Sequence, residues 1–131
     1  MMKSFETVYK ELEELFIQRL PEYIEKINKE YNDGIVLKRF ENHTLTEDCI
    51  KLPSFYFSLE ESEYTEKDRI IENSIYTVSF EILLAEYQKD RITILWRYVE
   101  SINRMFEEIE TDNIFKISEI KESKIFIRII L

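Results

Sequence analysis

The stretch IYTVSFEILL, residues 75–84, decides the fold class because apolar side chains occupy every second position. This period of two is typical of a β-strand that packs one face against a core. The other face is mixed, with polar residues among the apolar ones. We therefore expect a strand with helices packed on its apolar face. The side chains expected on that face are Tyr76, Val78, Phe80, Ile82 and Leu84.

Helical patterns lie on both sides of this strand. Residues 4–20 carry apolar side chains at three- and four-residue spacing, which predicts an amphipathic helix. Pro21 is expected to break or kink it, and a second piece, 22–32, is expected to end at the C-cap signal Asn32-Asp33-Gly34. Residues 91–110 predict another helix. Its expected apolar stripe comprises Ile92, Leu95, Val99, Ile102, Phe106 and Ile109.

Three further strands are expected, at 54–59, 114–120 and 125–131. The acidic stretch 60–68 is interpreted as a mobile loop, and 121–124 as a hairpin turn. The element order is then α(α)–β–β–α–β–β. This order defines an α+β fold, with a mainly antiparallel sheet of about four strands and two or three helices packed on one face. Because the chain ends in a strand, we expect an exposed sheet edge there.

Composition excludes several classes of protein. The 131 residues suit one domain, 1–131, and a hydrophobic content of 44% supports a real core. Gly34 is the only glycine, which excludes a phosphate-cradling loop built from several glycines. The net charge is −9 and no segment forms the basic stripe that nucleic-acid binding requires. With no membrane-length apolar run and no secretory signal, the protein is expected in the cytoplasm.

Few residues offer catalytic chemistry. Cys49 is the only cysteine and His43 the only histidine, so a dyad is conceivable, but a sole thiol and a sole imidazole are more often incidental. Carboxylates are abundant on the expected helix faces and in the stretch 60–68. A solvated surface explains them more simply than a metal site, which needs acids that converge from separate elements. We expect no catalytic residue, no cofactor and no metal.

Contacts with other proteins are expected at three places instead. The acidic stretch is one, and the terminal strand with its isoleucines is another. On the last helix, two arginines are expected to pair with Glu100 and Glu108 at the surface or to face an acidic partner, and Trp96 is expected in the core or at a subunit contact. The candidate assembly contacts are Glu60, Glu61, Glu63, Tyr64, Arg97, Arg104, Ile127 and Ile129.

Several segments together resemble a known family. They are LPEYIEKIN at 20–28, NDGI at 32–35, LPSFY at 52–56, the strand at 76–84 and LWRYVESI at 95–102. This pattern is similar to small proteins of phage and prophage tail modules, and the nearest group is the tail terminator or tail-completion family. None of these segments is an active-site signature.

The resemblance implies an α+β fold and a homo-oligomeric ring, commonly hexameric, at the head-proximal end of the tail tube. Such a ring stops tube polymerisation and contacts other tail or connector proteins. It implies no catalytic residues, and an acidic lumen that DNA passes without sticking agrees with the charge of −9. The short turn at 121–124 departs from the family, which has a longer insertion there.

Two other functions remain open. An acidic immunity or inhibitor-type protein would mask a basic partner, with association steered by charge. An enzyme with an acidic metal site is the third. Neighbouring genes discriminate the first two, since a tail-tube gene favours the tail and a toxin gene favours the inhibitor.

Overall fold

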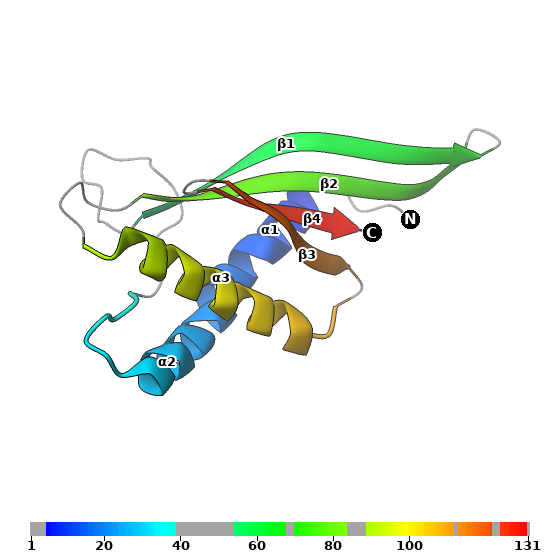
Figure 1. Ribbon diagram of the computed structural model, residues 1–131. Coiled ribbons are helices and arrows are strands. Elements are labelled where there is room, and N and C mark those ends of the chain that lie inside the picture. Colours follow the sequence, from blue (N-terminus) through cyan, green and yellow to red (C-terminus); the bar gives the residue numbers. More distant parts are fainter. Residues whose placement is uncertain are drawn as a thin grey trace.

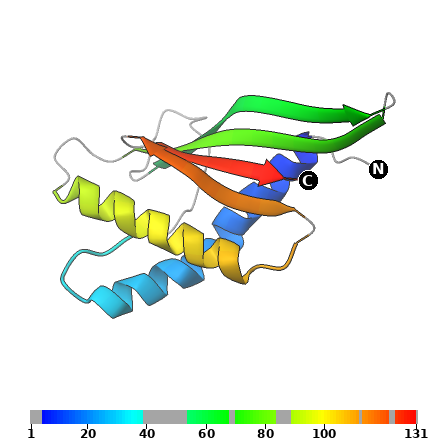
Figure 2. The same ribbon diagram turned by 45° about the vertical axis from the view of Figure 1, so that its right-hand side comes forward.

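The computed structural model describes residues 5–38, 54–67, 70–83, 89–111, 113–121 and 124–130. Its elements follow the order helix, helix, strand, strand, helix, strand, strand. The α+β class and the element order predicted from the sequence are therefore confirmed. Figures 1 and 2 show two layers, a four-stranded sheet and the helices that cover one of its faces.

The first helical region runs without a break through Pro21. It consists of α1 (Phe5–Glu14), the π-helical turn η1 (Leu15–Arg19) and α2 (Leu20–Tyr31). Of the break or kink expected at Pro21, the break is wrong, because the helix continues. The irregularity is the π turn just before Pro21, which leaves Pro21 in the first turn of α2, where its missing N–H costs least.

The π turn also explains an unusual spacing of buried residues. Four side chains at strict four-residue intervals are fully buried, and such intervals drift around a helix with 3.6 residues per turn. A wider π turn corrects part of that drift. The four residues are Val8, Leu12, Phe16 and Leu20.

The end of α2 confirms the predicted C-cap signal. Asn32 adopts the left-handed conformation with φ of 39°, and its N–H donates to the carbonyl of Asn28 at 3.1 Å. Gly34 follows with φ of +89°, a value that residues with a Cβ rarely adopt. These two residues turn the chain back beside α2, where the backbone of Leu37 forms two hydrogen bonds with the side chain of Asn28.

The sheet consists of β1 (Ser54–Lys67), β2 (Ile70–Leu83), β3 (Ile114–Lys121) and β4 (Lys124–Ile130), all antiparallel. Its spatial order is β1-β2-β4-β3. The C-terminal strand β4 therefore lies inside the sheet, and the expected exposed edge there is wrong. The outer strands are β1 and β3.

Strand β1 includes most of the acidic stretch that the sequence suggested was a loop. Glu61 to Lys67 pair with Ile70 to Thr77, so that interpretation of the stretch is wrong up to Lys67. Because β4 pairs with β2 only between Ile75 and Glu81, residues 64–67 and 70–74 pair only with each other in the described sheet. We call these nine residues the arm, which extends past β4 in Figures 1 and 2.

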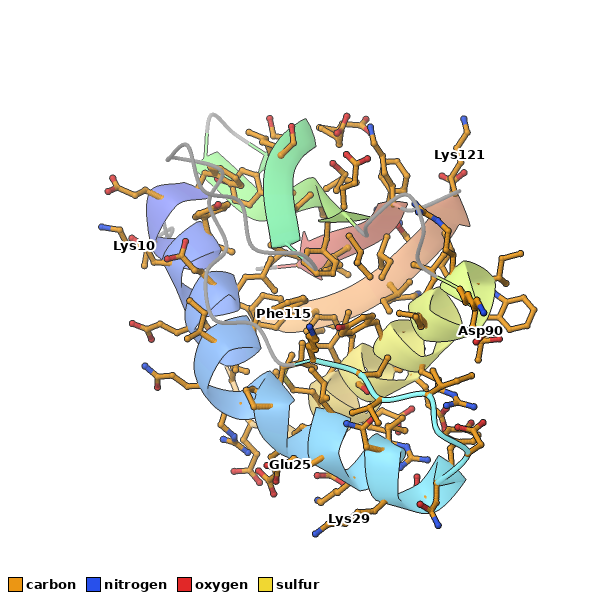
Figure 3. All side chains as sticks on the ribbon, turned by 90° about the vertical axis from the view of Figure 1, so that its left-hand side faces the viewer. Lys10, Glu25, Lys29, Asp90, Phe115 and Lys121 are labelled. Carbon is orange, nitrogen blue, oxygen red and sulfur yellow. The ribbon has the colours of Figure 1, made fainter. Side chains whose placement is uncertain are left out.

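The core lies between the helices and one face of the sheet. Phe16 of η1 packs edge-on against Phe80 of β2, with ring centroids 4.9 Å apart. Phe106 of α3 (Arg91–Glu108) stacks on Phe115 of β3 at 5.6 Å. Figure 3 shows Phe115 between the sheet and the helices. This packing agrees with the predicted role of the strand at 75–84, whose Tyr76, Val78, Phe80 and Ile82 are buried.

Most of the predicted apolar stripe of α3 packs on the core, since Ile102 is fully buried and Leu95, Val99, Phe106 and Ile109 are partly buried against it. Ile92 is instead 64% exposed, whereas Ile94, Tyr98 and Met105 are buried outside the stripe. The buried surface is wider than the stripe because α3 packs on both the sheet and α2. Two of its buried residues, Arg97 and Ser101, are polar. An apolar stripe alone cannot indicate them.

Candidate assembly surface

A group of polar residues joins the end of α2 to α3, and we call it the α2–α3 network. It consists of Glu30, Tyr31, Asp33, Arg97, Glu100 and Arg104. At its centre, Arg97 donates from both terminal nitrogens to the carboxylate of Asp33, with Nη1 and Oδ1 2.9 Å apart. The Arg97 guanidinium also lies over the Tyr31 ring, 4.1 Å from its centroid. Both contacts suit a planar cation.

The outer part of the network contains Arg104. It donates to Glu30 of α2 at 2.6 Å and to Glu100 of its own helix at 2.8 Å. The hydroxyl of Tyr31 donates to the second oxygen of Glu100 at 2.7 Å. Each charged group thus has a partner of opposite charge within the chain, so the network attaches α2 and the segment after it to α3.

The pKa values of Asp33 and Tyr31 are shifted in the directions that these hydrogen bonds predict. The hydrogen bonds from the Arg97 guanidinium lower the pKa of Asp33 from 3.8 to about 2. The hydrogen bond to Glu100 raises the pKa of Tyr31, since ionisation of the phenol would remove the donor. Deeper in the layer, burial raises the pKa of Tyr98, whose hydroxyl donates to the carbonyl of Lys38 at 2.8 Å.

The structure gives the two arginines other partners than the sequence suggested. The partner of Arg97 is Asp33, which the sequence pattern marked only as part of a helix stop. The side chain of Arg97 is 9% exposed, so it is a buried residue and not a surface one. Arg104 is 35% exposed and pairs with Glu30 and Glu100. Of the two, only Arg104 retains substantial exposure for a contact with another protein.

The terminal isoleucines proposed as contacts are core residues. Ile127 and Ile129 are both 0% exposed and face the helix layer from β4. The sequence predicts them at a sheet edge because the chain ends in that strand. Because β4 lies between β2 and β3, under the helices, these side chains are covered within the chain itself.

The acidic candidates all lie on the outer strand β1. Glu60 and Glu61 are exposed, and Glu60 accepts a hydrogen bond from Ser79 of β2 at 2.7 Å. Glu63 and Tyr64 continue the strand at the base of the arm, with their backbones opposite Ile75 and Ser74. The structure therefore brings these four candidates together along one sheet edge.

Exposed apolar side chains lie on α3, on β1 and on β3. On α3, Ile92 and Trp96 are each 64% exposed and lie one turn apart. Of the two locations expected for Trp96, the core is therefore wrong, and a subunit contact stays a prediction. On β1, Leu59 is 44% exposed, and on β3 Ile114 is 60% and Ile120 45% exposed. Both outer strands thus combine an open edge with exposed aliphatic side chains.

The two halves of the sheet have opposite charge. The β1–β2 hairpin, 54–83, contains seven acidic and two basic residues. The β3–β4 hairpin, 114–130, contains four basic and two acidic residues. Because the strand order places β1 and β3 on opposite sides, the sheet has an acidic edge, β1, and a basic edge, β3. Sequence alone contains these charges, but their placement requires the strand order.

Neither a metal-binding cluster nor a membrane-spanning helix occurs among the described residues. No three His, Cys, Asp or Glu side chains gather there into a group that could hold a metal ion. None of the helices in that part of the chain is long and apolar enough to cross a membrane. His43 and Cys49 lie outside the described residues.

No protein-family model matches the chain, and no curated protein matches it.

Proposed function

We propose that the chain is a non-catalytic structural subunit of a phage or prophage tail. In this proposal it forms a ring as a tail terminator or completion protein at the head-proximal end of the tail. It is made in the cytoplasm, ends in the virion, and contacts copies of itself and other tail or connector proteins.

The observation that carries the proposal is a sheet with two outer strands of opposite charge, both with exposed aliphatic side chains. Evolved proteins generally cover or blunt such edges, so two of them suit a chain that works by association. The resemblance to tail proteins adds the particular setting. Its segments at 20–28 and 95–102 fall on α2 and α3.

Disruption of the gene in the phage or prophage that encodes it tests the proposal. The induced lysate is then examined by electron microscopy, with the intact gene supplied from a plasmid as the control. We expect filled heads separate from tails or tubes of irregular length, and normal joined particles on complementation. Normal particles from the disrupted genome would refute a role in the tail.

A second function is favoured by the exposed carboxylates of β1. An acidic inhibitor of a basic toxin or nuclease would present such an edge, and its complex would weaken as salt rises. Coexpression with the product of the adjacent gene distinguishes the two functions. A stable, salt-sensitive pair with a basic toxin supports the inhibitor, whereas association with a tail-tube protein supports the tail.

A further inference from the structure

Within the described residues, each outer strand of the sheet has one side without a pairing strand. No other described strand pairs beyond β1 or beyond β3. All three pairings within the sheet are antiparallel, so strand directions alternate across it and β1 and β3 run in opposite directions. If a second copy lies beside the first in the same orientation, its β1 therefore runs antiparallel to β3. The helices of both copies then cover the same face.

The faces of the two outer strands also match. Leu59 is opposite the buried Val78 and therefore points to the helix side of the sheet. On β3, Ile117 and Ile120 are opposite the buried Ile127 and Ile125, so they point to the same side. Ile117 is half-buried, whereas Leu59 and Ile120 are largely exposed, because the helix layer does not cover the two edges fully.

Charged residues alternate with these positions on the open face. Glu61 of β1 is opposite Thr77, which points away from the helices, and Glu61 is exposed. On β3, Lys116 and Glu119 are opposite Arg128 and Phe126 on the same open face, and both are exposed. An antiparallel neighbour can therefore bring Glu61 opposite either a lysine or another carboxylate.

We propose that the partner of this protein is a second copy of its own chain, and that β1 of one copy pairs antiparallel with β3 of the next. Glu60 is the extra residue of a β-bulge between Leu59 and Glu61, so Leu59 and Glu61 face consecutive positions of a partner strand. With this bulge kept, the register that sets Leu59 opposite Ile117 puts Glu61 opposite Lys116. The register that sets Leu59 opposite Ile120 would put Glu61 opposite Glu119, and like charges directly opposite are destabilising. The inference rests on the proposed function in so far as that function needs copies to assemble.

Charge also selects this contact over symmetric ones. Pairing β1 with β1 would bring two acidic strands together, and like-charge juxtaposition disfavours it. Pairing β1 with β3 is heterologous, which means that two different surfaces meet. A heterologous contact leaves one acidic and one basic edge free at the ends of any short chain of copies. It therefore continues until a ring closes or a filament grows.

Charge reversal tests the contact. Sedimentation velocity is measured on the full chain at low and high salt for the wild type, Glu61→Lys, Lys116→Glu and the double variant. We expect each single reversal to weaken association about tenfold, because a cross-strand attraction becomes a repulsion. The double variant restores the attraction at every contact and should associate like the wild type. Association of the wild type should weaken as salt rises.

Glu25→Lys and Lys29→Glu provide matched controls. They change the net charge by the same amounts, and Figure 3 shows both side chains on α2, away from the sheet. Thermal unfolding of each variant checks that it folds. Single reversals that behave like the controls, or a double variant no better than the singles, would place the contact elsewhere without touching the proposed assembly role. A wild type that stays monomeric at all concentrations would also overturn this contact, while the gene disruption judges the tail role separately.

Discussion

At the scale of single residues, the pair of Arg97 and Asp33 makes stability depend on pH. A carboxyl whose pKa is lowered on folding adds stability above its unfolded pKa, and this contribution is lost as pH falls through the folded value. For Asp33 that window lies between 3.8 and about 2. The wild type should lose part of its stability there, whereas Asp33→Asn should be less stable at pH 7 and depend less on pH in the window.

Urea unfolding at several pH values between 7 and 2 measures this difference. Other carboxyl groups titrate in the same range, so the informative quantity is the wild-type midpoint minus the Asp33→Asn midpoint. Glu25→Gln, a change at an exposed carboxyl on α2, is the matched control. Midpoints of the wild type and Asp33→Asn that fall in parallel would show that the pair contributes no pH-dependent stability.

The side chain of Asn28 is a second contact on which stability depends. Its amide donates to the carbonyl of Leu37 at 3.0 Å, and its oxygen accepts from the Leu37 N–H at 2.8 Å. Asn28→Ala leaves both part-buried groups without these partners, which should cost about 2–4 kcal/mol of unfolding free energy. Urea unfolding measures the loss, with Asn103→Ala on the exposed side of α3 as the control. A loss as small as that of the control would contradict the role of Asn28.

At the scale of elements, the arm should be the least protected part of the sheet. Residues 64–67 and 70–74 form only a two-stranded ribbon, and such ribbons are marginally stable in water. Amide hydrogen exchange should therefore be faster there than in Val78 to Glu81, which lie between β1 and β4. Equal protection of the two segments in the monomer would show that the arm is supported by a contact outside the described residues.

Some elements of the fold could be predicted from the sequence and others could not. The strand at 75–84 was predictable because burial of one face imposes a period of two. The acidic stretch 60–68 has no such period, because an outer strand that extends past the core needs no apolar face. Its sequence therefore predicts a loop, although most of it belongs to β1. The π turn before Pro21 was not predictable from helix-breaking rules, because the chain inserts a wide turn and continues.

The candidate contact residues also differ in how well the sequence predicts their surroundings. The candidates on β1 lie along one sheet edge because they are close in sequence, and their role as contacts stays a prediction. Arg97 was misjudged because its partner Asp33 is far away in sequence and belongs to a helix end. Ile127 and Ile129 were misjudged because the position of β4 depends on strand order, which periodicity does not reveal.

At the scale of the whole molecule, helices cover one face of a sheet whose two edges differ in charge. Apolar and charged surface for contact lies at three places. They are the face opposite the helices, the exposed Trp96 of α3, and the two outer strands. Charge is distributed unevenly over the sheet, because the β1–β2 hairpin is acidic and the β3–β4 hairpin is basic. A molecule built in this way is suited to repeated association in one direction.

The mass of the wild-type protein in solution tests this central claim most directly. Size-exclusion chromatography with light scattering, over a wide range of protein concentration at low salt, gives that mass. We predict that it rises from the 16.0 kDa of one chain to a discrete multiple at high concentration, and falls again in high salt. A mass of 16.0 kDa throughout, both alone and with tail tubes added, would contradict the claim that this chain works by assembling.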